Sequence, residues 1–144
     1  MYFFLFLFLN CQSQIAGSNP VPGGKQIAYE DKNHYPFSLT SKDFLMIDSQ
    51  EKMDEVFRII NQHTNGKRFS PIPAVMENET YLVIKPDLKN SNDISVESVV
   101  LNKDILFVQV KAFENPDFRK ESRFSPNILL KLKGKVSFKK ITIK

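Results

Sequence analysis

The chain has 144 residues, a length that suits one domain able to fold without disulfides. Its residues are 42% hydrophobic and 25% charged, which is typical of a globular protein, and the formal net charge of +4 is too small for a typical nucleic-acid binder. Its single cysteine, Cys11, excludes an intramolecular disulfide.

The first eleven residues form an apolar run that ends at this cysteine. Residues 2–9 carry no charge, and as a helix they would span about 12 Å, far short of the roughly 30 Å core of a bilayer. Residues 1–11 resemble a bacterial lipoprotein signal, in which Cys11 becomes the lipidated N-terminus. The residues just before Cys11 fit that pattern only loosely, so a plain cleaved secretion signal and a buried N-terminal strand stay open.

A polar stretch follows, and then the domain. Residues 12–24 contain Ser, Asn, Pro and a Gly pair, which predicts a flexible tether. We expect one domain over residues 25–144. It opens with a short strand at 25–29, a loop at 30–36 and a compact apolar strand at 44–47.

One helix is predicted after this strand. Apolar residues recur there at helical spacing: Met53, Val56, Phe57 and Ile60. This stripe predicts a helix over residues 49–63 that buries one face. Asp48 and Glu51 have the spacing of a capping box, so we expect Asp48 to cap the helix. The Pro-Ile-Pro sequence at 71–73 then enforces an extended loop.

The second half of the chain is predicted to consist mainly of β-strands. Residues 81–85 are apolar and predict a central strand. Residues 94–101 and 105–113 flank a short turn sequence and predict a hairpin, and residues 127–132 and 135–143 predict a second hairpin around a glycine.

Alternation in the first hairpin predicts which side chains are buried. Ile94, Val96 and Val100 share one parity and are expected on the buried face. Helices of about 10–15 residues do not alternate with the strands, so parallel βαβ winding is not expected. The fold class is α+β: an antiparallel β-sandwich or partial barrel of about six to seven strands, with one helix in the N-terminal half.

This order of elements resembles the PrcB-like family, small exported bacterial domains named after an accessory subunit that stabilises a surface protease complex. The resemblance covers residues 25–144 and is clearest at 44–60, 81–84, 98–111 and 125–132. It implies a domain that binds a partner and has no enzymatic activity. Where family members carry a Gly-Gly-Tyr-like segment, this chain has Asn-Ser-Asn-Asp-Ile.

Residues that could support catalysis or metal binding are few. His34 and His63 lack the spacing of metal ligands, so both are expected to be solvated surface residues and no metal or cofactor is predicted. Four acids lie near the predicted hairpin ends and are interpreted as solvated turn residues: Asp87, Asp93, Glu97 and Asp104. No catalytic residue is predicted.

Two features are candidates for binding. Aromatic residues beside arginines are typical of interface anchors, which makes Phe118, Arg119, Arg123 and Phe124 a candidate partner-binding loop. The alternative is that both phenylalanines plug the end of the sandwich. Six lysines lie near the C-terminus, either to attract anionic lipid or polysaccharide or to protect an edge strand: Lys131, Lys133, Lys135, Lys139, Lys140 and Lys144.

We therefore expect a non-catalytic lipoprotein domain of the cell envelope, anchored on the periplasmic side of a membrane, that binds or stabilises a protein partner. The alternative is a carrier or sensor that holds a small apolar or anionic ligand between the sheet and the helix. The predicted partners are an envelope protein and the membrane, with no nucleic acid.

Overall fold

The computed structural model describes residues 23–64, 69–88, 90–117 and 126–144. This part of the chain contains one helix and eight strands. Their order is β1 (Lys25–Gln26), β2 (Tyr29–Tyr35), β3 (Phe44–Ile47), α1 (Gln50–Gln62), β4 (Glu79–Ile84), β5 (Asp93–Asn102), β6 (Ile105–Phe113), β7 (Asn127–Lys133) and β8 (Lys140–Ile143).

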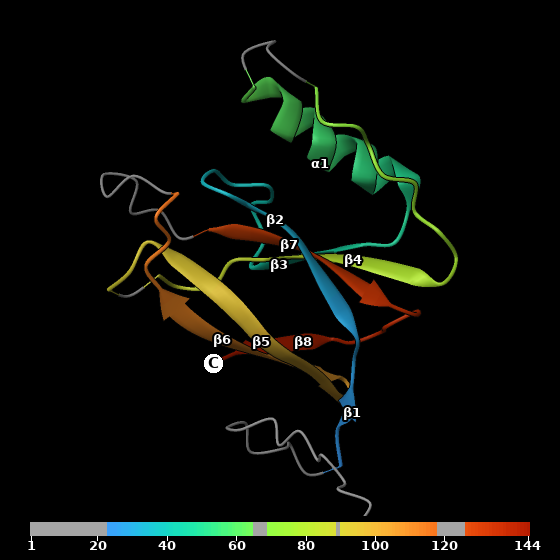
Figure 1. Ribbon diagram of the computed structural model, residues 1–144. Coiled ribbons are helices and arrows are strands. Elements are labelled where there is room, and N and C mark those ends of the chain that lie inside the picture. Colours follow the sequence, from blue (N-terminus) through green and yellow to red (C-terminus); the bar gives the residue numbers. More distant parts are fainter. Residues whose placement is uncertain (1–22, 65–68, 89, 118–125) are drawn as a thin grey trace, which may run out of the picture.

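The strands form two sheets that pack face to face, as the α+β sandwich prediction requires. Sheet A has the strand order β1-β5-β6-β8, and sheet B has the order β2-β7-β4-β3. The helix α1 lies across the outer face of sheet B, so the layers are helix, sheet B and sheet A (Figure 1). The sheets do not close into a barrel.

Sheet B lies between two hydrophobic cores, and this position explains the continuous apolar runs of its central strands. Along β4, Leu82 and Ile84 face sheet A, while Tyr81 and Val83 face α1. On β7, Leu130 likewise faces sheet A. A strand buried on both faces has no polar side to alternate with, so it reads as an unbroken apolar stretch.

β2 is the strand that the sequence did not predict. Residues 30–36 were expected to form a loop, but β2 extends to Tyr35 and pairs antiparallel with β7 from Tyr29↔Leu132 to Tyr35↔Asn127. It is an edge strand whose middle residues are exposed and polar. Its backbone hydrogen bonds therefore hold it in the sheet without any apolar alternation that a sequence pattern could reveal.

The helix agrees with the prediction, but its cap differs. Met53, Val56, Phe57 and Ile60 are all buried against sheet B. The N-cap is Ser49, whose Oγ accepts a hydrogen bond from the backbone N–H of Lys52 at 3.3 Å. The helix begins one residue later than an Asp48 cap would require, and the carboxylate of Asp48 instead contacts the Lys52 ammonium at 2.9 Å.

The first predicted hairpin is confirmed as β5 and β6, paired from Asp93↔Phe113 to Asn102↔Ile105. The pairing shifts between Val96 and Ser98, so Glu97 is an extra residue on β5. After this bulge, each side chain of β5 points to the opposite face of the sheet from the one that simple alternation predicts. Val99, which is fully buried, occupies the core position that parity had assigned to Val100.

The second predicted hairpin is wrong. β7 belongs to sheet B, whereas β8 belongs to sheet A and pairs parallel to β6. Gly134, with φ of +90°, turns the chain out of sheet B, and Val136 and Phe138 are buried as it crosses to sheet A. The backbone N–H of Lys139 then donates to the carbonyl of Asp104 at 2.7 Å and sets the start of β8.

Candidate functional site

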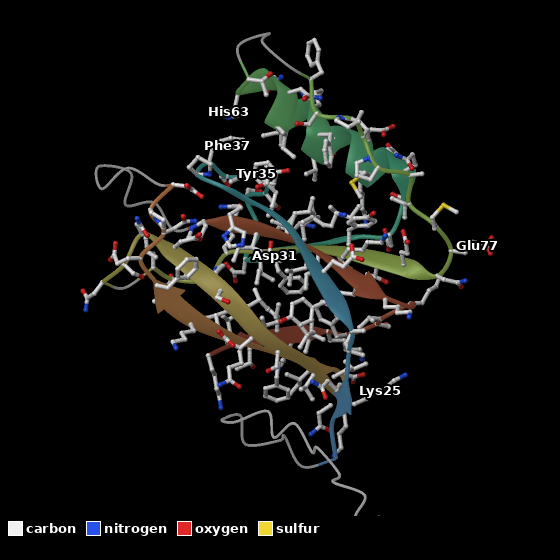
Figure 2. All side chains as sticks on the ribbon, viewed as in Figure 1. Lys25, Asp31, Tyr35, Phe37, His63 and Glu77 are labelled. Atoms are coloured by element: carbon white, nitrogen blue, oxygen red, sulfur yellow. The ribbon has the colours of Figure 1, made fainter. Side chains whose placement is uncertain are left out.

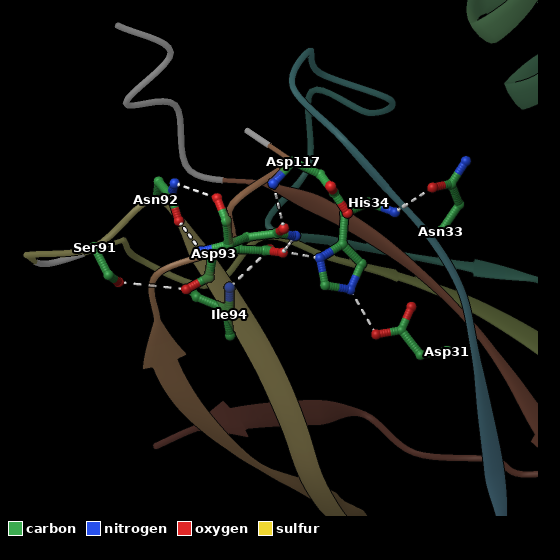
Figure 3. A network of polar contacts seen from close by, with 9 residues as sticks. Asp31, Asn33, His34, Ser91, Asn92, Asp93, Ile94 and Asp117 are labelled. Carbon is green, nitrogen blue, oxygen red and sulfur yellow. Dashed lines mark hydrogen bonds and ion pairs between the residues drawn. The ribbon is translucent and has the colours of Figure 1, made fainter. Parts of the chain in front are cut away.

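A histidine held between two carboxylates joins the sheets at one end of the sandwich (Figure 3). Nδ1 of His34, on β2, lies 2.7 Å from Oδ1 of Asp93 on β5, and Nε2 lies 2.5 Å from Oδ2 of Asp31. The pairing shift of β2 at Lys32 puts Asp31 and His34 on the same face, opposite Leu130 and Ile128, so both side chains point toward sheet A.

Asp93 is the buried member of this network. Its side chain is 3% exposed, and its oxygens also accept hydrogen bonds from the backbone N–H of Ile94 at 2.8 Å and from the amide of Asn115 at 2.7 Å. Asn92 exchanges two further hydrogen bonds with the backbone of Asn115. The network therefore compensates the buried charge of Asp93 and fixes the chain that leaves β6.

The electrostatics of His34 favour its charged form. Burial of the imidazole lowers its pKa, but the hydrogen bonds and negative charges of Asp31 and Asp93 outweigh burial and raise the pKa above the ordinary value of 6.5. Both ring nitrogens and both oxygens of Asp93 bond protein groups, so this arrangement suits a clamp between sheets rather than a nucleophile and its base.

These positions correct two expectations. His34 is not a solvated loop residue: it lies on β2 with a side chain that is 14% exposed. Asp93 is a buried strand residue and not a solvated turn acid. His63 is exposed at the end of α1 as expected, but its ring stacks on Phe37 with centroids 3.8 Å apart. Figure 2 labels both residues, near the end of the helix.

Within residues 23–64, 69–88, 90–117 and 126–144, no group of three or more His, Cys, Asp or Glu side chains is placed to hold a metal ion. Over the same residues, the structure has no helix with the length and apolar character needed to cross a membrane.

An extended segment of apolar residues follows α1, and we call residues 69–76 the strap. It runs back along the helix and ends beside Glu77 (Figure 2). Three large apolar side chains of the strap are exposed: Phe69 at 72%, Ile72 at 46% and Met76 at 58%. Among the described residues, Phe113 is the one other exposed large apolar side chain, at 38%. Apolar side chains gathered in this way are typical of interaction sites.

The strap is fixed to the helix by two side chains of α1. The side-chain oxygen of Asn61 accepts a hydrogen bond from the backbone N–H of Ser70 at 2.8 Å. At the other end, the Gln50 amide donates to the carbonyl of Pro73 at 3.0 Å and accepts from the N–H of Val75 at 2.9 Å. Val75 packs inward on the core between α1 and sheet B. These hydrogen bonds and the packing of Val75 therefore fix the strap in a conformation that leaves Ile72 and Met76 exposed.

A groove of about 950 Å³ adjoins the strap at Met76, and we call it the strap groove. Ala28 and Tyr29, at the start of β2, line it together with Met76. Lys131 also lines it, and its ammonium lies 2.9 Å from the carboxylate of Glu79. That hydrogen bond raises the pKa of Lys131. The groove thus combines apolar walls with a fixed ion pair.

A second groove, of about 780 Å³, opens between the two sheets at the end of the sandwich. Its apolar lining comes from β5, β6 and β8: Ile94, Val110, Ala112, Ile141 and Ile143. Pro86, two lysines and two aspartates complete it, the charged residues being Lys85, Lys144, Asp43 and Asp87. We call it the end groove.

The predicted site residues lie largely outside the described part of the chain. Cys11 and the candidate loop of Phe118, Arg119, Arg123 and Phe124 fall among residues that the structure does not describe. The C-terminal lysines do lie within it and are divided between layers. Lys131 lies on the helix side of sheet B, while Lys140 starts the edge strand β8 of sheet A.

Comparison of the chain with protein-family models, with curated protein sequences and with solved structures gave no match.

Sequence reasoning missed both the His34 network and the strap. Asp31, His34 and Asp93 show no motif, because 59 residues separate His34 from Asp93 and a bulge brings Asp31 onto the same face. The strap did carry a signal. Its Pro-Ile-Pro sequence predicted an extended loop, and prolines without N–H groups keep such a segment out of a sheet. The exposure of its apolar residues could not be deduced from that pattern.

Proposed function

We propose that this chain is a non-catalytic accessory domain that binds a protein partner at the cell envelope. The observation that carries the proposal is the strap, whose hydrogen bonds with Asn61 and Gln50 of α1 hold its large apolar side chains in water. Keeping large apolar side chains exposed costs solvation free energy, and a bound partner removes that cost by covering them.

Two further expectations agree with this role. The resemblance to the PrcB-like family implies an accessory domain without catalysis. Lipid on Cys11, with residues 12–24 as a tether, would hold the domain near membrane partners and raise its local concentration there. Both belong to the proposal and have their own tests.

The partner-binding proposal is tested by capture from envelopes. The full tagged chain is expressed in its source cells, cross-linked, solubilised and purified, and bound proteins are identified by mass spectrometry. We expect one protein to be enriched with the wild-type chain and lost with the triple change Phe69→Ser, Ile72→Ser and Met76→Ser. Phe113→Ser is the matched control, since Phe113 is exposed on β6, away from the strap. Failure to enrich any envelope protein would refute the proposal.

The same experiment compares the strap with the loop predicted from sequence. The double change Arg119→Ala and Arg123→Ala should weaken capture if that loop forms the partner site, with the melting temperature nearly unchanged. Loss of capture with the strap variant alone would place the interface on the strap. A large loss of stability in the arginine variant would make that loop structural.

The anchor is tested by intact mass analysis of the native protein. We expect acyl chains on Cys11 and loss of membrane association in Cys11→Ser. A native protein that retains Met1 would contradict the lipoprotein proposal.

The end groove favours a second candidate function, a carrier or sensor of a small ligand. The space between α1 and sheet B is filled by buried side chains such as Met53 and Leu129, so the end groove is the better place for such a ligand. Its apolar lining suits an apolar chain, and Lys85 and Lys144 could contact an anionic head, although Asp43 and Asp87 line the same groove and oppose that charge. Decanoate is a direct probe. Binding that Val110→Trp abolishes would support this function, and absence of binding would exclude fatty acids as the ligand class.

A further inference from the structure

We infer that the strap and the strap groove bind a protein segment that presents apolar side chains next to lysine or arginine. The inference rests on the proposed partner-binding function and adds the chemistry of the partner. It uses the end of the strap from Ile72 to Met76, which lies near the first turn of α1.

The apolar part of this face is continuous. Ile72 and Met76 point outward, whereas Pro73 and Val75, which alternate with them, are partly buried. Of these two, Val75 packs on the core between α1 and sheet B. Met76 also lines the strap groove, together with the backbone region at the start of β2. A partner can therefore cover the two exposed side chains and place an apolar side chain of its own in the groove, which is the usual arrangement of an interface anchor.

Carboxylates surround this end of the strap. Asp54 accepts a hydrogen bond from the same Gln50 amide that binds Pro73, so it lies beside the strap, and Glu77 directly follows Met76. The exposed carboxylates here and on the first half of α1 are Asp48, Glu51, Asp54, Glu55 and Glu77. A chain whose formal net charge is +4 thus has an acidic face at the strap.

The cations near this face neutralise it only in part, because carboxylates outnumber lysines among the residues that line its two hollows. Lys52 lies 2.9 Å from Asp48, and Arg58 lies 4.0 Å from Glu55. Lys135 lines a hollow that Asp48 and Glu77 also line. In the strap groove, Lys131 is paired with Glu79, and the exposed Lys133 lies there together with Glu30 and Glu77. Among the described residues, no ion pair occupies Glu51, Asp54 or Glu77. These three carboxylates are therefore available to a partner's cations, which gives the face electrostatic specificity.

The same charges argue against a membrane as the occupant. Anionic lipid headgroups attract basic protein surfaces, and they would repel a face rimmed by Glu51, Asp54 and Glu77. The apolar side chains alone would favour a bilayer, but the acidic rim favours a basic polypeptide.

The test is selection of random linear peptides displayed on phage against the full chain. We expect the enriched peptides to carry bulky apolar residues beside lysine or arginine. Synthetic copies should bind about tenfold or more weakly to the double variant Ile72→Ser and Met76→Ser. They should also lose affinity as salt is raised and in the variant Glu51→Gln, Asp54→Gln and Glu77→Gln. Phe113→Ser is the control and should bind as the wild type does.

Several outcomes would overturn the inference. Enriched peptides that are acidic or purely apolar, or that bind the strap variant unchanged, would refute it. Strap-dependent binding to anionic vesicles, or strap-dependent self-association of the chain, would assign the face to lipid or to a second copy. The envelope capture experiment tests the proposed function independently of this inference. If a captured partner is lost with the strap variant but still binds the carboxylate variant, the proposed function stands and the inference of a basic partner is refuted.

Discussion

His34 and Asp93 lie 2.7 Å apart and join the two sheets through one charge-assisted hydrogen bond, although the strands that carry them belong to different sheets. Asp31 contacts the other ring nitrogen, and Tyr29 on the same strand donates a hydrogen bond to the carbonyl of Val96 on β5 at 2.7 Å. The edge of sheet B is thus tied to sheet A by polar contacts around a hydrophobic core. Such contacts are directional, so they fix how the sheets sit on each other more tightly than apolar packing alone does.

The first prediction is that stability depends on pH through His34. Its pKa is higher in the folded protein than its ordinary value of 6.5, so the folded state binds this proton more tightly than the unfolded chain does. The contribution of His34 is therefore complete below about pH 6.5 and is lost as the pH rises through the raised pKa. Urea unfolding of the full chain across this range should show a falling free energy of unfolding.

His34→Gln should flatten that slope and lower stability at mildly acidic pH by about 1–3 kcal/mol. His63→Gln is the matched control, because it keeps the His34 network and should keep the slope. An unchanged pH profile in His34→Gln would contradict the assignment of the slope to this residue.

The second prediction concerns Asp93. In Asp93→Asn, one side-chain oxygen is replaced by an NH₂ group that must face either the donor of Asn115 or the protonated imidazole of His34. The mismatch lies in a buried site, so we expect a loss of about 1–3 kcal/mol in the free energy of unfolding. Thermal or urea unfolding measures it. Asp117→Asn, at an exposed position in the same region, should change stability little.

The third prediction separates the two candidate caps of α1. Ser49→Ala removes the acceptor for the N–H of Lys52 and should cost about 1 kcal/mol. Asp48→Asn removes an exposed ion pair and should cost less than about 0.5 kcal/mol. If the two effects were reversed in urea unfolding, Asp48 would be the functional cap.

The fourth prediction concerns the turn between β5 and β6. Lys103 has φ of +54°, a conformation that strains any residue with a Cβ. The φ of Asp104 is not positive, so its backbone carries no such strain. Lys103→Gly should raise the free energy of unfolding by about 0.5 kcal/mol, since the relief of strain exceeds the entropy that glycine adds to the unfolded chain. Asp104→Gly has no strain to relieve and should lower it. Stabilisation by both changes would point to general flexibility of the turn instead.

The fifth prediction tests the central layer. Leu130 is fully buried between the sheets, and Leu130→Ala should cost about 2–5 kcal/mol, because sheet B has covered faces on both sides and little room to relax. Leu88→Ala, at a partly buried position on the same core, should cost clearly less. Equal losses would mean that the core between the sheets has no well-packed centre.

The sequence by itself determined the elements whose burial repeats with a regular period. The helix was predictable because Met53, Val56, Phe57 and Ile60 repeat at helical spacing, and the hairpin of β5 and β6 because two apolar runs flank a short turn. The α+β sandwich with one helix followed from those elements. The short apolar run before Cys11 gave an expectation about the envelope, which its own experiment must test.

The tertiary structure alone decided the partners of each strand. β8 pairs with β6 and not with β7, since alternation says which face of a strand is buried but not which neighbour covers it. β2 is held by the backbone of β7, which leaves no pattern in its side chains. His34 and Asp93 met because the edge strand β2 of sheet B lies against the first residue of β5 in sheet A. Ile72 and Met76 are exposed because Gln50 and Asn61 hold the strap. Contacts between residues distant in sequence leave no local period, and this is why only the fold could show them.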